Sequence, residues 1–183
     1  LMSASTSLND RLAAARSASR TLAVMSPGDK VDALEAMARA LASRSAEIIA
    51  ENAEDVQAAR QANAPTAMVD RLLLDDSRLD AMAQGIRAVA ALPDPVGIVD
   101  AGWRVSNGLE ILETRVPLGV IGVIYEGRPN VTTDAAALAL KSGNAIVLRG
   151  SSIAARSNGI LGDVVMAALA GAGVPDGAIT MLG

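Results

Sequence analysis

The chain has 183 residues, a formal net charge of −4 and 51% hydrophobic residues. This length is enough for one domain with a buried core, which Ala and branched aliphatic side chains must fill because the chain has one Trp, one Tyr and no Phe. The absence of Cys and His excludes disulfides, a thiol nucleophile, a Ser-His-Asp triad and His-ligated metals from this chain. With an acidic balance and no basic stripe, we expect no nucleic acid partner.

Residues 1–95 have a pattern that is helical almost throughout. Apolar side chains recur at helical spacing from Leu8 and Leu12 onward, which predicts a first amphipathic helix. Ser26 then precedes Pro27, and an N-cap residue followed by proline at the first helical position predicts that a second helix starts there.

Two further long helices are predicted before the pattern changes. Residues 45–62 combine an apolar stripe with an acidic face that ends at Asp55, and we interpret this face as solvated rather than as a metal site. Asp75 or Asp76 caps the last helix. The prolines within residues 93–95 stop it.

A hairpin follows the helices. Residues 102–105 and 109–116 are strand candidates, and Ser106-Asn107-Gly108 between them contains the Asn-Gly pair that is typical of hairpin turns. The hairpin is far from any large apolar run, so we expect an arm of the kind that pairs with another subunit.

The last third of the chain alternates strand and helix. The elements are expected at residues 118–125, 131–142, 145–148, 153–172 and 178–182. Residues 118–125 are almost wholly apolar, which suits a strand buried on both faces. The β-α-β-α-β order implies a parallel sheet with right-handed crossovers. Three parallel strands leave an open edge, so we expect this sheet to be incomplete.

No targeting segment is apparent. The N-terminus lacks the basic and apolar regions of a signal peptide, and the longest apolar stretch, residues 164–174, is too short to cross a bilayer. We therefore expect a cytoplasmic protein with no membrane partner.

Two loops at the carboxyl ends of the strands are candidate sites, because ligands of open parallel sheets bind there. The first loop, residues 126–130, contains Arg128 and Asn130 and precedes a helix start that can hold an anion. The alternative interpretation is that Asn130 or Thr132 only caps the helix and that Arg128 is solvated.

The second loop follows the second strand. Arg149 and the hydroxyls of Ser151 and Ser152, with Gly150 between them, can pair with a phosphate. The alternative is an ordinary strand-to-helix loop in which Ser152 is the N-cap.

Two long motifs carry a family resemblance, residues 116–132 (VPLGVIGVIYEGRPNVT) and residues 140–151 (LKSGNAIVLRGS). Through them the chain closely resembles the gamma-glutamyl phosphate reductases, or glutamate-5-semialdehyde dehydrogenases, of the aldehyde dehydrogenase superfamily. The resemblance covers nearly all of the chain from about residue 8. It implies an α/β fold with N-terminal helices, a partial parallel Rossmann-like sheet and a β-hairpin oligomerisation arm. It also implies reduction of gamma-glutamyl phosphate by NADPH in proline biosynthesis.

The resemblance divides the chain into three parts. Residues 1–95 would be the helical part of the cofactor-binding domain, and residues 96–117 would be the arm. Residues 118–183 would be the first, incomplete part of the NADP-binding sheet. The strands at residues 102–116 would then join subunits of a homo-oligomer.

The resemblance also implies roles for individual residues. Asn130 matches the asparagine that holds the oxyanion, and Arg149 matches a residue that contacts the adenosine ribose or its 2′-phosphate, where a cation suits NADP. The other implied cofactor contacts are Ile124, Tyr125, Gly150, Ser151 and Ser152. That Arg128 holds the phosphate of the substrate is our own hypothesis, and no metal is expected.

One departure from the family pattern concerns catalysis. The family's nucleophile is a cysteine in a later domain, and this chain has no Cys. We therefore expect an N-terminal portion of the reductase that is inactive alone. One alternative is a non-catalytic module for cofactor binding or assembly. Another aldehyde dehydrogenase is disfavoured, because typical members carry a tryptophan-asparagine loop at the position of residues 126–130.

Overall fold

The computed structural model describes residues 7–182. Residues 1–6 and Gly183 lie outside the described part, and with them the N-terminal segment of the signal-peptide prediction. The helices are α1 (Leu8–Leu22), α2 (Pro27–Ser43), α3 (Ser45–Gln61), α4 (Thr66–Leu72), α5 (Asp76–Ala91), α6 (Asn130–Lys141), the 3₁₀ turn η1 (Ser152–Ala154) and α7 (Ala155–Gly171). The strands are β1 (Val99–Arg104), β2 (Glu110–Thr114), β3 (Val120–Ile124), β4 (Ala145–Arg149) and β5 (Ile179–Leu182).

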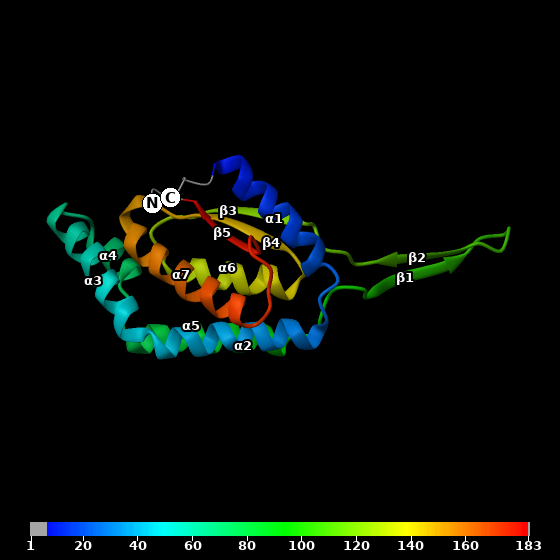
Figure 1. Ribbon diagram of the computed structural model, residues 1–183, viewed down its shortest axis with the longest axis horizontal. Helices are drawn as coiled ribbons and strands as arrows, with labels where there is room; N and C mark the ends of the chain where they lie inside the picture. The colour runs from blue at the N-terminus through cyan, green and yellow to red at the C-terminus, as the bar shows by residue number, and fades with distance from the viewer. Residues whose placement is uncertain (1–6, 183) are drawn as a thin grey trace, which may run out of the picture.

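The body of the molecule is layered around a parallel sheet of order β3-β4-β5. Helix α1 lies across one face of this sheet, and α6 and α7 cover the other (Figure 1). Helices α2 and α5 form a further layer against α6 and α7 (Figure 1). The predicted α/β fold with a parallel three-stranded sheet is therefore confirmed.

The prediction of a first strand buried on both faces is wrong for β3. Val120 is partly exposed and the side chain of Ile124 is 86% exposed, whereas Ile146 and Leu148 of β4 are buried. The reason is position in the sheet: β4 lies between two strands, whereas β3 pairs with β4 alone among the described residues. An apolar sequence therefore predicts a strand but does not distinguish an edge strand from a central one.

The first helix buries only part of the predicted apolar stripe, which also included Ala15 and Leu22. Leu8 and Leu12 are exposed, and the buried face of α1 consists of Ala15, Ala18 and Leu22 in its second half. Small side chains allow close approach to the sheet. The loop before β5 also contributes: a Cβ on Gly177 would lie 2.7 Å from the carbonyl carbon of Ala14, so only glycine fits there.

The predicted helix starts are confirmed at two places. Ser26 caps α2 and accepts a hydrogen bond from the backbone N–H of Asp29. Asp75 caps α5 in the same way, through the backbone N–H of Arg78. Hydroxyl and carboxylate oxygens satisfy donors that the first turn of a helix leaves free.

The interpretation of the acidic face of α3 as solvated is wrong for Asp55. This side chain is buried, and its Oδ2 accepts hydrogen bonds from the backbone N–H and the hydroxyl of Ser157, at 2.8 and 2.7 Å. Ser157 lies in the first turn of α7, where the helix dipole favours a negative charge. Asp55 therefore caps a helix that is about 100 residues away in the chain.

Strands β1 and β2 form the predicted hairpin, which extends away from the body of the molecule (Figure 1). Its first strand is longer than predicted, because β1 already begins at Val99, and its second strand is shorter, because β2 spans only Glu110–Thr114. The Ser106-Asn107-Gly108 loop has Gly108 at a φ of 87°, the left-handed residue that three-residue hairpin loops require. Trp103 and Leu112 are exposed on the hairpin.

One helical segment, Ser152–Gly171, is long and apolar enough to cross a membrane by length and composition, whereas the sequence analysis expected none. Half of its apolar window is buried inside the protein. Its buried residues, Leu161, Val164 and Val165 among them, belong to the main hydrophobic core. These contacts are those of a core helix, and a core helix can be as long and as apolar as one that crosses a membrane.

Candidate functional site

The carboxyl ends of β3 and β4 bring the two candidate loops together. Ile124 pairs in register with Arg149, and the backbone N–H of Tyr125 donates to the carbonyl of Arg149 at 3.1 Å. The loop after β3 also reaches η1, because a Cβ on Gly127 would lie 2.7 Å from Cγ2 of Ile153. The two loops therefore form one continuous surface at this edge of the sheet.

A polar cluster beneath this surface joins the loops to α6 and α7. The Tyr125 hydroxyl and Thr132 Oγ1 share a hydrogen bond of 2.6 Å, and Thr132 Oγ1 donates to Asn158 Oδ1 at 3.3 Å. A Cβ on Gly150 would lie 2.1 Å from Asn158 Nδ2. Any larger residue at position 150 would therefore displace the Asn158 amide, which occupies the space beside it.

The phenol of Tyr125 stays protonated at physiological pH, and its role in this cluster is to form a hydrogen bond. Burial raises its pKa above the ordinary value, against a smaller lowering by the hydrogen bond with Thr132. Sequence reasoning missed Asn158, since a lone Asn inside a helical segment gives no signal before the tertiary contact is known.

The side chains at the surface of this edge remain available for a ligand. Arg149 and Ser152 are exposed, as is Ile124, and Arg149 forms no ion pair with any residue from 7 to 182. Ser151 rather than Ser152 is the cap, since its Oγ accepts from the backbone N–H of Ile153 in η1. A cation, a hydroxyl and an apolar side chain in one place match the phosphate and the flat rings of a nucleotide.

In the first loop, Arg128 is exposed and Asn130 is the first residue of α6. Neither Asn130 nor Thr132 caps this helix through its side chain, so the capping part of that alternative is wrong, whereas its expectation of a solvated Arg128 agrees with the exposed side chain. Asn130 instead donates from Nδ2 to Asp134 Oδ2 at 2.9 Å. The second hydrogen on that nitrogen is available to another acceptor.

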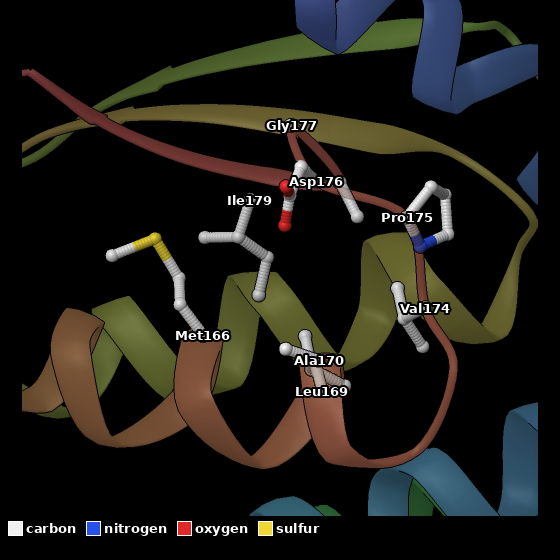
Figure 2. Close-up of a pocket in the computed structure, with 9 residues that line it drawn as sticks. Met166, Leu169, Ala170, Val174, Pro175, Asp176, Gly177 and Ile179 are labelled. Carbon is white, nitrogen blue, oxygen red and sulfur yellow. The ribbon is translucent and has the colours of Figure 1, made fainter.

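Two hollows lie near the ends of these helices. One, of about 380 Å³, is bounded by α4, α5 and the start of α6, and Arg71, Met82, Asn130 and Asp134 are among its lining residues. The other, of about 60 Å³, lies between the end of α7 and the start of β5, among apolar side chains such as Met166 and Ile179 (Figure 2). The second hollow is at the amino end of the strands, away from both loops.

A family model for the aldehyde dehydrogenase family matches residues 2–183. The chain belongs to this family. It is 54% identical over 168 residues to the gamma-glutamyl phosphate reductase of Thermobifida fusca and 51% identical to that of Rhodopseudomonas palustris. These matches cover 92% of this chain but 40% and 39% of the two relatives. The chain thus spans about 40% of the length of these curated relatives.

Solved structures agree with this assignment. The gamma-glutamyl phosphate reductase of Thermotoga maritima superposes with a TM-score of 0.92 at 39% identity, over 96% of this chain and 42% of that one. The yeast enzyme gives 0.91 at 30% identity, over 99% and 47%. A salicylaldehyde dehydrogenase from Pseudomonas putida, at 21% identity and a TM-score of 0.72, shares the fold.

Proposed function

We propose that this chain is the cofactor-binding part of an NADPH-dependent gamma-glutamyl phosphate reductase, which makes glutamate-5-semialdehyde in proline biosynthesis. The observation that carries the proposal is the exposed Arg149 side chain beside exposed Ile124, at the carboxyl ends of two parallel strands. The names of the two reductases described above support the choice of substrate. The reaction takes place in the cytoplasm.

The residues present fit a dinucleotide phosphate. Arg149 pairs with the 2′-phosphate of the adenosine ribose, and the hydroxyls of Ser151 and Ser152 donate to it or to the ribose. Ile124 and Tyr125 form the apolar wall of the site, and Gly150 leaves room for the Asn158 amide beneath it. The bound cofactor supplies the hydride of the reduction.

On the substrate side, Asn130 donates from Nδ2 to the oxygen of the reacting carbonyl, where negative charge develops. Its bond to Asp134 fixes the orientation of the amide. Arg128, exposed at the loop, holds the phosphate that leaves. No metal takes part.

Catalysis needs a group that this chain does not contain. The chemistry of this family proceeds through a cysteine thioester, and the chain has no Cys. We propose that the cysteine lies in a separate domain, so that residues 1–95, 96–117 and 118–183 supply the helical layer, the arm and the first part of the NADP-binding sheet. The chain alone is then expected to show no turnover.

The hairpin serves assembly in this proposal. Trp103 and Leu112 are exposed on a two-stranded ribbon that projects from the body (Figure 1). Pairing of the strands at residues 102–116 with a second copy would bury these side chains and make a homo-oligomer.

Fluorescence titration of the chain with NADPH and with NADH tests the cofactor assignment. Arg149→Ala should weaken NADPH binding about tenfold or more, because a hydrogen bond to a charged group contributes about 1.5–3 kcal/mol, and leave NADH binding nearly unchanged. Arg16→Ala, which changes an exposed arginine on α1 outside the two candidate loops, is the matched control. Equal losses for both cofactors, or for both variants, would contradict the proposal.

A further inference from the structure

The hollow between α4, α5 and α6 places opposite charges on its wall. Arg71 comes from the end of α4, and Asp134 comes from the second turn of α6, with Asn130 beside it. Its volume of about 380 Å³ is within the range of small-molecule sites, roughly 300–1,000 Å³. The part of its lining from Leu73, Leu74 and Met82 is apolar.

One cation and one carboxylate in the hollow are available to pair with a ligand. Arg78 also lines it, but its guanidinium is already paired with Asp70 at 2.7 Å and donates to the carbonyls of Asp70 and Leu73. Arg71 is exposed and has no ion-pair partner within residues 7–182. Arg71 is therefore the cation that a ligand can reach.

Asp134 is a partly buried carboxylate with few partners. Asn130 Nδ2 is its one hydrogen-bond donor among the described residues, and burial raises the pKa of Asp134 against the smaller lowering by that bond. An ammonium group would compensate the lost solvation of this carboxylate. A phosphate at the same place would be repelled by it.

We propose that this hollow binds the α-amino acid head group of the substrate, with Arg71 on the α-carboxylate and Asp134 on the α-ammonium group. This inference rests on the proposed function and adds its substrate subsite. A ligand held in this way extends its side chain along the wall that carries Asn130. Asn130, the proposed oxyanion donor, lines the same hollow, so the γ-carbonyl of this ligand lies on its side.

The test uses L-glutamate and two analogues that each lack one of its charged groups. L-glutamate carries both α-groups, glutarate lacks the ammonium, and 4-aminobutyrate lacks the α-carboxylate. Titration of the ¹⁵N-labelled chain, followed by NMR chemical shifts, gives each dissociation constant up to the millimolar range. L-glutamate should bind at least about tenfold more tightly than either analogue, since each loses a charge-assisted hydrogen bond.

Two variants assign the charges. Arg71→Ala should weaken L-glutamate about tenfold and leave 4-aminobutyrate unchanged. Asp134→Asn should weaken L-glutamate and leave glutarate unchanged. Arg16→Ala, on α1 across the sheet from α6, is the control and should change none of the three (Figure 1).

The results separate this inference from the proposed function. No saturable glutamate binding, equal affinity for the three ligands, or no effect of Arg71→Ala would overturn the head-group site. NADPH titration of the same sample reports on the cofactor site independently. Loss of NADPH selectivity with glutamate selectivity intact would overturn the cofactor assignment and support the hollow. Arg71 is exposed, so its variant tests binding even where Asp134→Asn does not fold.

Discussion

The strongest stability prediction concerns a buried ion pair where the helical layer meets the hairpin. Lys30 of α2 is 1% exposed and its Nζ lies 2.9 Å from Oδ2 of Asp94, whose side chain is 11% exposed. Asp94 also accepts the backbone N–H of Val96 at 2.9 Å. Replacing Lys30 with Met keeps much of the side-chain volume and removes the positive charge, which leaves the carboxylate of Asp94 without its main partner.

Removing one partner of a buried pair costs about 3–5 kcal/mol. Because Asp94 retains the bond to Val96 and lies close to solvent, we expect Lys30→Met to cost about 3 kcal/mol, near the lower limit. At about 2–4 °C per kcal/mol for a chain of this size, the Tm should fall by about 6–12 °C.

Urea unfolding of a double-mutant cycle measures the interaction. The variants are Lys30→Met, Asp94→Leu and the pair together, and the double variant should be more stable than the sum of the single losses predicts, by about 1–3 kcal/mol. The control is Arg44→Met, which removes the cation of an exposed ion pair with Glu47 and should cost far less than Lys30→Met. A cost below about 1 kcal/mol for Lys30→Met, or additive single losses, would refute the reasoning.

Three further predictions follow from single contacts. Burial alone would raise the pKa of Asp94, but Lys30 and Val96 outweigh it and the net pKa is lowered. The stabilisation by Asp94 is therefore present above its unfolded pKa, about 3.9, and is lost as the pH falls below that value. Below this pH, the free energy of unfolding of Asp94→Asn should decrease less steeply with falling pH than that of the wild type. Equal slopes would contradict this. Asp55→Ala should cost about 1–3 kcal/mol in urea, because it leaves the first turn of α7 without its buried acceptor, whereas Glu54→Ala on the exposed side should cost almost nothing. Gly150→Ala should lower the free energy of unfolding by about 1–3 kcal/mol and weaken NADPH binding, because its Cβ would overlap the Asn158 amide. Ser152→Ala, at a nearby exposed position, should leave stability unchanged. A Gly150→Ala chain as stable as the wild type would contradict the close packing.

The sequence predicts local structure well where the signal is itself local. Ser26 and Asp75 identify helix starts because a cap bonds to an N–H three residues along the same chain. The loop that ends in Gly108 identifies the hairpin because the turn needs a residue with a positive φ. The motifs at residues 116–132 and 140–151 identify the family before any contact is known.

Contacts between distant elements could not be predicted in this way. Residue composition gives no difference between an apolar strand at the edge and one in the centre, so β3 was expected to be buried. The acidic pattern of α3 gives no sign that Asp55 faces the start of α7, which lies about 100 residues later in the chain. The same holds for the hollow, which Arg71 and Asp134 line from helices more than 60 residues apart.

The sequence by itself determined the family, the element order and the absence of a thiol in this chain, since these depend on residue identity and on spacing along the chain. The tertiary structure decided which side chains share a surface. It set Gly150 against Asn158, left Arg149 exposed at the strand ends with no ion-pair partner among residues 7–182, and put Arg71 in one hollow with Asp134. Packing makes these choices because an element buries whichever face its neighbours cover, and the identity of those neighbours is not encoded in any one segment.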